Sequence, residues 1–284
     1  QLGKKLDSDQ PELWLQSINS VEADDIAILV YTSGTTGPSK GAMINHKNLL
    51  YSVNTGVEIF EAREHEEQLS FLPLCHILER SVSVMFPLKT GAVVNFAESI
   101  DTVPENIREV SPTVFVAVPR IWEKFYSSIT ILMKDATFIG RYFYNLSINT
   151  GAKYKEYFIE GKEPPLKLKL MFWICNQLVL KNIKKLLGLN NCRYALSGAA
   201  PISPELINWY LSLGIDMREG WGMTETAGVG TAFYSREIKL GHVGRAVNNS
   251  EVRIADDGEI LFKGPGVFCG YLNKPEQTNE TLID

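Results

Sequence analysis

The sequence has few residues that bind soft metals or form disulfides: four cysteines and four histidines among 284 residues. The cysteines lie far apart and form no C-x-x-C pair, which argues against a disulfide framework and against a zinc cluster. No H-E-x-x-H occurs, so a histidine-ligated metal is disfavoured as well. We therefore expect any metal to bind through oxygen, and we expect a reducing, cytoplasmic compartment.

Long apolar runs and an excess of basic residues are also missing. A membrane-spanning helix needs about 20 apolar residues, and the nearest run, over residues 170–180, is interrupted by Asn176 and Gln177. Acidic residues outnumber basic ones by 33 to 28, and the net charge of -5 argues against nucleic acid as a partner. The chain begins with Gln1 and shows no leader, so we expect a slice of a longer protein.

Short apolar runs rich in β-branched residues alternate with helical patterns. Because these runs are apolar on both faces, they predict parallel strands in a sheet covered by helices. The runs lie at residues 26–31, 68–73, 92–97, 113–119 and 192–199. With 45% hydrophobic and 21% charged residues, the sequence predicts a globular α/β fold with mainly parallel sheets.

Helical patterns fill most of the segments between these runs. The stretch SPELINWYLSLG begins with Ser203 as N-cap and Pro204 at the first helical position, and Gly214 lies just past its end. Two further helices are predicted at 46–60 and 76–91, the second ending at Gly91.

The order of the patterns predicts the domain organisation. Residues 120–190 are compatible with helix throughout and carry no strand signal, which indicates an α-helical insertion of about that extent between two strands. Near the C-terminus, SEVRIADDGEILFKG alternates around an Asp-Asp-Gly turn and predicts an antiparallel hairpin. We expect an α/β core over residues 1–239 and the start of a small β subdomain over 240–284.

The stretch YTSGTTGPSKGAM, residues 31–43, joins glycines, hydroxyl side chains and one lysine directly after an apolar run. Glycine lets the backbone approach an anion closely, and Lys40 adds a point charge suited to phosphate. A flexible turn explains two or three such residues, whereas ten consecutive positions favour a polyphosphate site. The Walker A spacing fails because Gly41 follows Lys40 where that motif has Ser or Thr.

The segment 165–193 is basic within an acidic chain. It contains six basic residues and no acid: Lys167, Lys169, Lys181, Lys184, Lys185 and Arg193. Leu180, Ile183 and Leu187 share one helical face. Two interpretations stay open: an interfacial helix that gives the protein a peripheral contact with a membrane surface, or a solvated face above a buried stripe.

The sequence resembles the adenylate-forming superfamily, which includes acyl-CoA synthetases, luciferases and the adenylation domains of peptide synthetases. YTSGTTGPSKGAMINH is similar to its phosphate-binding motif, although the proline that usually precedes the lysine lies one place earlier, at Pro38. Further motifs match in the expected order: LPLCHILER (72–80), ALSGAAPISPEL (195–206), REGWGMTETAG (218–228), GHVGRAV (241–247) and GEILFKGPGVFCGYLNKPEQT (258–278). The resemblance covers nearly all of residues 24–284, and 120–190 with LPLCHILER most resembles the long-chain fatty acyl-CoA synthetases.

The resemblance implies a large N-terminal domain that activates a fatty acid with ATP and Mg²⁺ to acyl-AMP and then forms a thioester with coenzyme A. Adenylation followed by transfer to a carrier protein or another acceptor stays open, as does a noncatalytic lipid- or nucleotide-binding homologue. The resemblance also implies a T-G-D motif, a hinge and a mobile C-terminal domain with a catalytic lysine. None of these lies within residues 1–284, so we expect this fragment alone to form no thioester.

The resemblance assigns roles to individual residues. Glu225 would hold Mg²⁺, with Thr32 as a second oxygen ligand, and Trp221 would stack on adenine. The implied catalytic residues are Lys40, His76, Thr224 and Glu225. The implied nucleotide-binding residues are Thr32, Ser33, Gly34, Thr35, Thr36, Gly37, Lys40, Gly198, Ala199, Ala200, Glu219, Gly220, Trp221, Gly222, Met223 and Thr224.

Overall fold

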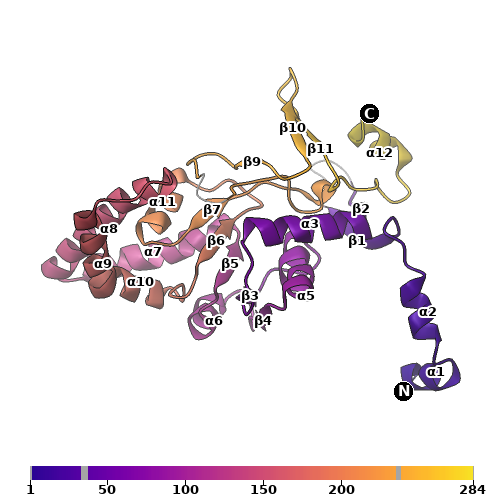
Figure 1. Cartoon of the computed structure of the whole chain (residues 1–284), viewed down its shortest axis with the longest axis horizontal. Coiled ribbons are helices and arrows are strands. Elements are labelled where there is room, and N and C mark those ends of the chain that lie inside the picture. Colours follow the sequence, from indigo (N-terminus) through magenta and orange to yellow (C-terminus); the bar gives the residue numbers. More distant parts are fainter. Residues whose placement is uncertain (1, 33–37, 235–237, 284) are drawn as a thin grey trace.

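The computed structural model describes residues 2–32, 38–234 and 238–283. Two parallel sheets lie at its centre (Figure 1). Their strands are β3 (Glu67–Ser70) with β4 (Val93–Phe96), and β5 (Val114–Ala117) with β6 (Tyr194–Ser197) and β7 (Met217–Glu219). The Thr113 N–H donates to the Glu67 carbonyl at 2.9 Å, which joins the two sheets. Four of the predicted apolar runs, at 68–73, 92–97, 113–119 and 192–199, form the parallel strands β3, β4, β5 and β6. The predicted α/β fold is therefore confirmed.

Aromatic side chains fill the core beside the three-stranded sheet. Trp122 and Tyr210 are fully buried, with ring centroids 5.0 Å apart, and Phe115 of β5 packs against Trp122. The side-chain donors of Trp122 and Tyr210 both have hydrogen-bond partners. Trp122 Nε1 donates to the Ala117 carbonyl at 3.2 Å, and Tyr210 Oη donates to the Trp122 carbonyl at 2.8 Å. These contacts fix helix α7 (Pro119–Asp135) and helix α11 (Pro204–Ser212) on the sheet.

The predicted helical insertion is present between β5 and β6 and extends to one end of the molecule (Figure 1). After α7 it consists of α8 (Phe138–Ile159), α9 (Leu166–Cys175), the π-helical turn η2 (Asn176–Leu180) and α10 (Lys181–Leu186). The predicted boundaries of α11 are confirmed: the Ser203 hydroxyl accepts from the Leu206 N–H at 3.2 Å, and Gly214 has φ +81°. Helices α8 and α11 approach closely, since a Cβ at Gly151 would lie 1.9 Å from the Ser212 carbonyl oxygen.

The basic segment turns its apolar stripe inward. Leu180, Ile183 and Leu187 are buried in the main hydrophobic cluster, so this stripe is closed to a bilayer. Lys181 and Lys185 are exposed, whereas burial lowers the pKa of Lys184. The interpretation of residues 180–187 as an interfacial helix is therefore wrong for this stripe, because the helix uses its apolar face to pack on the core.

One predicted parallel strand is antiparallel instead. The run at 26–31 forms β1 (Ile26–Thr32), which pairs antiparallel with β2 (Lys40–Asn45). The seven residues between these strands are too few for the crossover that a parallel pair requires, so only an antiparallel pairing is open to them. The segment 269–272 continues the sheet beyond β2, since Met43 N–H donates to the Gly270 carbonyl at 2.9 Å and Leu272 N–H donates to the Gly41 carbonyl at 2.8 Å.

Two helical segments cover the parallel sheets near β1 and β2. The first is α3 (His46–Ile59), capped by Asn45; the second runs through α4 (Ile77–Arg80), the π-helical turn η1 (Ser81–Met85) and α5 (Phe86–Thr90). The second ends at Gly91 with φ +75°, as predicted. Buried Glu79 accepts hydrogen bonds from Ser70 of β3 at 2.6 Å and from Ser83 of η1 at 2.8 Å, which ties this helix to the sheet.

Smaller elements surround this body. The predicted hairpin is present as β10 (Glu251–Ile254) and β11 (Ile260–Lys263). The other elements are α1 (Leu2–Asp9), α2 (Leu13–Asn19), α6 (Val103–Val110), the 3₁₀ turn η3 (Thr224–Thr226), β8 (Thr231–Ala232), β9 (Arg245–Ala246) and α12 (Pro275–Thr281). A division at residue 240 stays a prediction. In the described parts of the chain, no helix combines the length and the apolar character needed to cross a membrane.

Candidate active site

A cavity of about 360 Å³ lies at the carboxyl ends of the three parallel strands β5, β6 and β7. Val118 follows β5, Gly198 and Ala199 follow β6, and Gly220 and Trp221 follow β7, and all five line it. Ligands of open α/β sheets bind at this end, because loops leaving neighbouring strands there frame a crevice. The strand order of the sheet therefore gathers residues that are about a hundred positions apart in the sequence.

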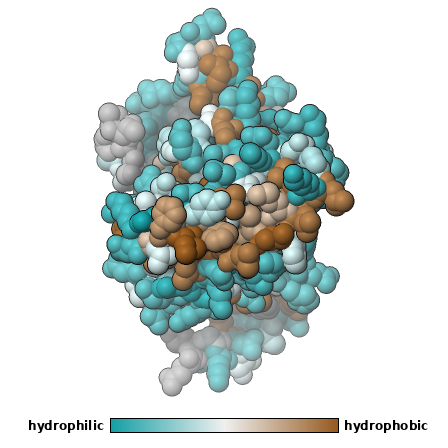
Figure 2. Space-filling model, turned by 90° about the vertical axis from the view of Figure 1, so that its left-hand side faces the viewer, coloured by the Kyte–Doolittle hydropathy of each residue, from teal (hydrophilic) through white to brown (hydrophobic). Residues whose placement is uncertain are grey.

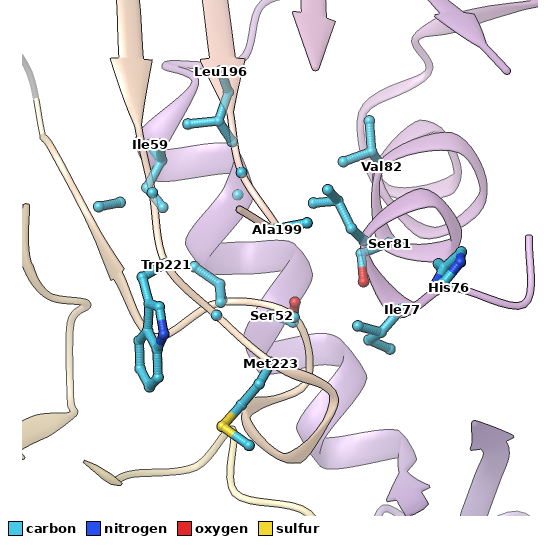
Figure 3. A pocket seen from close by; sticks show the side chains of 18 of the residues that line it. Ser52, Ile59, His76, Ile77, Ser81, Val82, Leu196, Ala199, Trp221 and Met223 are labelled. Atoms are coloured by element: carbon cyan, nitrogen blue, oxygen red, sulfur yellow. The ribbon is translucent and has the colours of Figure 1, made fainter. Parts of the chain in front are cut away.

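Helices α3 and α4–η1 form the opposite wall, and this wall is mostly apolar (Figure 3). Its lining side chains include Val53, Ile59, Phe60, Ile77, Leu78, Val82 and Phe86. On the same wall Gly56 leaves space, since a Cβ there would meet nothing closer than 3.9 Å. A wall of this chemistry suits an apolar ligand rather than a nucleotide alone.

His76 and Ser81 supply polar groups on this wall. His76 stands at the start of α4, makes no capping hydrogen bond with its side chain and lies across the cavity from Trp221 (Figure 3). The hydroxyl of Ser81 is buried and has no hydrogen-bond partner within the described residues. A buried hydroxyl without a partner is costly, so its position at a cavity fits a ligand that carries oxygen.

The loop after β7 is held in one conformation by close backbone contacts. A Cβ at Gly222 would lie 2.4 Å from the carbonyl oxygen of Gly228, and Gly228 itself has φ +94°. The carbonyl of Met223 accepts from the N–H groups of Thr226 at 3.1 Å and Gly228 at 2.9 Å. These bonds form η3 and leave Thr224 on the cavity wall.

Trp221 is fixed by the strand that follows this loop. Its N–H donates to the Thr231 carbonyl at 3.1 Å, and its carbonyl accepts from the Thr231 N–H at 2.9 Å. The indole ring fills the space where Gly230 has no side chain, since a Cβ there would lie 2.5 Å from it. These backbone contacts hold the ring at the cavity.

A second group of polar residues surrounds Tyr271. The Tyr271 hydroxyl donates to Glu225 Oε1 at 2.6 Å, and Lys40 Nζ lies 5.0 Å from the centre of the Tyr271 ring. Thr32 pairs with Lys40 at the end of the β1–β2 hairpin, its hydroxyl 3.5 Å from the Lys40 carbonyl. Glu225 is adjacent in the chain to Thr224, so this group and the cavity share an edge.

The tyrosine is held beneath Lys40 by the strand-like segment 269–272. Ala42 and Tyr271 face each other in an isolated antiparallel bridge. Tyr271 is 7% exposed, and burial together with the neighbouring Glu225 carboxylate raises its pKa to about 12. The hydroxyl is therefore protonated at neutral pH and donates to the carboxylate.

Sixteen of the eighteen residues predicted from the resemblance fall into three groups. Eight line the cavity: His76, Gly198, Ala199, Gly220, Trp221, Gly222, Met223 and Thr224. Lys40 and Glu225 both contact Tyr271, and Thr32 pairs with Lys40. Ser33, Gly34, Thr35, Thr36 and Gly37 lie outside the described residues.

The other two predicted residues, Ala200 and Glu219, belong to none of these groups. Ala200 is exposed beyond the end of β6. The Glu219 carboxylate is buried and accepts from the Ile202 N–H at 3.4 Å, and burial raises its pKa. Its side chain supports the turn before α11, because alternate residues of a strand point to opposite faces of the sheet.

Sequence reasoning missed three features of the site. Tyr271 belongs to one of the quoted motifs, but nothing local signals that it bonds a residue 46 positions earlier. The orphan hydroxyl of Ser81 is visible only once its surroundings are known. Helical periodicity predicted the helix at 46–60, but the same pattern arises whether its apolar face covers a cavity or a packed core.

Known proteins resemble this chain in sequence and fold. The family of AMP-binding enzymes matches residues 2–272. The putative fatty-acid–CoA ligase fadD11 of Mycobacterium tuberculosis is 34% identical over 264 residues, which cover 93% of this chain and 46% of that protein. The long-chain-fatty-acid–CoA ligase ACSBG2 of Xenopus laevis is 32% identical over 99% of this chain and 39% of its own length.

Solved structures share the fold at lower identity. The N-terminal domain of FACL13 from Mycobacterium tuberculosis superposes with a TM-score of 0.64 at 22% identity, over 93% of this chain and 56% of that one. The O-succinylbenzoate coenzyme A synthetase of Bacillus subtilis, in complex with AMP, gives 0.64 at 20% identity, over 93% and 46%. The chain spans less than half the length of the curated relatives described above. By its match over nearly all of its length, the chain belongs to the family of AMP-binding enzymes.

Proposed function

We propose that the complete protein activates a long-chain fatty acid with ATP and Mg²⁺ to acyl-AMP and then transfers the acyl group to coenzyme A. The observation that carries the proposal is the meeting of two environments at Thr224. On one side lies an apolar cavity, and on the other lie Lys40, Tyr271 and Glu225. The names of the relatives, which are fatty-acid–CoA ligases, support the same substrate class.

The chemistry requires a cation and hydrogen-bond donors at phosphate, and an apolar environment at the acyl chain. A carboxylate attacks the α-phosphorus of ATP, the bond to the β-phosphate oxygen breaks, and pyrophosphate leaves. A thiol then attacks the acyl carbon, and AMP leaves. Such reactions depend mainly on positioning and charge neutralisation, because the enzyme itself forms no bond to phosphorus.

In this scheme each residue has one task. Lys40 binds the departing phosphates, Thr224 binds the reacting oxygens, and His76 holds the acyl carboxylate on the far wall. Trp221 contacts the adenine, which reaches the backbone beside Gly198. A Cβ at Gly198 would meet only the Gly220 carbonyl oxygen at 3.7 Å, so this edge has room for a flat ring.

The residues present fit a magnesium ion. Mg²⁺ prefers oxygen ligands and is commonly held by one or two carboxylates together with phosphate oxygens, so a large cluster of protein ligands is not needed. Glu225, bonded to the tyrosine whose ring Lys40 overlies, would supply one carboxylate, and Thr32, paired with Lys40, would supply a hydroxyl. Bound there, Mg²⁺ would neutralise phosphate charge and polarise the reacting phosphate.

A pyrophosphate-exchange assay on the complete protein tests the proposal. Labelled pyrophosphate enters ATP only when adenylation is reversible and a suitable carboxylate is present. We expect exchange to rise with chain length across a series of saturated carboxylates and to be greatest for long chains. If no carboxylate supports exchange, the adenylation proposal is overturned and a noncatalytic homologue is favoured. If exchange occurs but coenzyme A, when supplied, is not consumed, the acceptor is a carrier protein or another molecule.

The proposed substrate also indicates where in the cell the protein acts. Long-chain fatty acids partition into bilayers, because each buried methylene contributes about 0.8 kcal/mol. We therefore place the protein in the cytoplasm with a peripheral contact at a membrane surface. The buried stripe of Leu180, Ile183 and Leu187 does not provide that contact.

A further inference from the structure

Helix α9 carries an apolar stripe that faces away from the protein. Leu166, Leu170 and Ile174 recur at every fourth residue, and Leu178 continues the spacing into η2. These four side chains are between 43% and 83% exposed. Residues four apart lie one above the other on a helix, so they form one continuous line.

The opposite side of the same helix is used for packing. The Phe172 ring stacks on Tyr154 of α8 with centroids 4.2 Å apart, and Cys175 is buried. Helix α9 is thus apolar on both sides, and only one side has a partner within the described residues. The inner side packs α9 on the protein, so this packing does not account for the apolar residues on the outer side.

Neighbouring helices extend the exposed apolar surface. Figure 2 looks onto the end of the molecule formed by the insertion and shows apolar residues gathered in a band across it. The exposed apolar side chains of the neighbouring helix α8 include Phe138, Ile139, Tyr142 and Phe143. Surface apolar residues on ordinary soluble proteins are scattered singly, so a band of this size marks an interaction surface.

The insertion is also the basic part of an acidic protein. Residues 131–186 contain ten Lys and Arg against four Asp and Glu, a net charge of +6, whereas the whole chain carries -5. Lys167, Lys181 and Lys185 are exposed close to the α9 stripe in the sequence, and Lys169 pairs with Glu163. An apolar stripe with aromatic residues and flanking lysines complements a surface that is apolar inside and anionic at its rim.

We propose that the outer stripe of α9, with Trp173 beside it, docks the protein on an anionic lipid bilayer. The leucines enter the boundary between headgroups and acyl chains, Trp173 lies at the interface, and the exposed lysines contact anionic headgroups. The docking is independent of the adenylation chemistry and stands whether or not that proposal holds. A second copy of this chain would be an apolar partner as well, but two such faces would bring two basic surfaces together.

Vesicle co-sedimentation of the complete protein tests the proposal with two variants. One is Leu170→Ser with Trp173→Ser, which shortens the stripe at exposed positions and leaves the packing of α9 on α8 intact. The other is Lys167→Glu with Lys181→Glu. The matched controls are Leu88→Ser with Ile260→Ser and Arg253→Glu with Lys263→Glu, which change exposed residues elsewhere. Thermal unfolding of each variant checks that the fold is retained.

We expect the wild type to bind vesicles of phosphatidylcholine with about 30% phosphatidylglycerol more tightly than phosphatidylcholine alone, and less so at high salt. The stripe variant should lose about tenfold in partitioning to both vesicles. The lysine variant should lose only the preference for anionic lipid, and the controls should match the wild type.

Three results would overturn the proposal. These are a wild type that binds no vesicles, a stripe variant that binds them as tightly as the wild type does, and control variants that lose as much binding as the stripe and lysine variants do. Light scattering adds one more check. A shift of the stripe variant from dimer to monomer, with unchanged vesicle binding, would assign this face to a second copy instead.

Discussion

The hydroxyl of Tyr271 lies 2.6 Å from Glu225 Oε1 and donates a hydrogen bond to it. The carboxylate that the resemblance assigns to magnesium is therefore oriented by a neighbour. Because Lys40 lies over the ring of the same tyrosine, one side chain contacts both the cation and the anion of the proposed phosphate site. We therefore propose that Tyr271 positions the two charges of this site.

Replacing Tyr271 by Phe removes this hydrogen bond and keeps the ring beneath Lys40. A hydrogen bond to a charged group contributes roughly 1.5–3 kcal/mol, so we expect the Mg²⁺ concentration needed for half-maximal pyrophosphate exchange to rise about tenfold. The Tyr142→Phe variant, on the exposed face of α8, serves as control. An unchanged Mg²⁺ dependence in Tyr271→Phe would refute the positioning role.

Replacing Lys40 by Ala removes the cation from the phosphate site. A charge-assisted contact to phosphate contributes roughly 1.5–3 kcal/mol, so adenylation should slow by one or more orders of magnitude. Lys40→Arg keeps the charge and should retain more activity, while Lys47→Ala, nearby on α3, should behave as the wild type. Pyrophosphate exchange at saturating fatty acid measures the effect, and an undiminished rate in Lys40→Ala would contradict the assignment.

Two glycines at the cavity allow a matched comparison. A Cβ at Gly222 would lie 2.4 Å from the Gly228 carbonyl oxygen, so Gly222→Ala should displace the loop that carries Thr224 and lower stability by about 1–3 kcal/mol. A Cβ at Gly198 makes only an ordinary contact, so Gly198→Ala should keep its stability and weaken nucleotide binding by narrowing the edge of the cavity. Denaturant unfolding and nucleotide titration measure the two effects. Equal stability of both variants would argue against the close contact.

The pair Glu66–Arg193 predicts how stability depends on pH. Burial raises the pKa of Glu66, but the hydrogen bonds from Arg193 and Thr113 and the Arg193 charge outweigh it and lower the pKa below its ordinary value. A lowered folded pKa means that the pair stabilises the fold above the unfolded pKa, about 4.3. This contribution is lost as the pH falls through the folded value.

Removing the Arg193 cation should therefore leave the buried Glu66 carboxylate without its charged partner. We expect Arg193→Gln to cost roughly 2 kcal/mol at neutral pH, less than for a fully buried pair because the Arg193 side chain is 22% exposed. Its acid unfolding should begin at higher pH than in the wild type. The exposed pair Glu105–Arg108 is the control, and Arg108→Gln should change stability by less than about 0.5 kcal/mol. The same acid midpoint in Arg193→Gln and in the wild type would disprove the linkage.

Much of the fold follows from local patterns. The ends of α11 were predictable because Ser203 and Gly214 satisfy or permit backbone geometry within a few residues of themselves. The helical insertion and the β10–β11 hairpin were predictable for the same reason, since periodicity and an Asp-Asp-Gly turn are local signals. The β1 run shows the limit: its apolar character marked a strand, but the short connection to β2 fixed the antiparallel direction.

The candidate site likewise depends partly on local sequence and partly on contacts between distant segments. The amino-acid sequence by itself determined which segments carry glycine, hydroxyl and charged groups, and in what order. Only the tertiary structure decided that Tyr271 joins Lys40 to Glu225, that Glu219 faces away from the cavity, and that α9 leaves its stripe exposed. The physical reason is that backbone geometry depends on nearby residues, whereas these contacts depend on how distant elements pack.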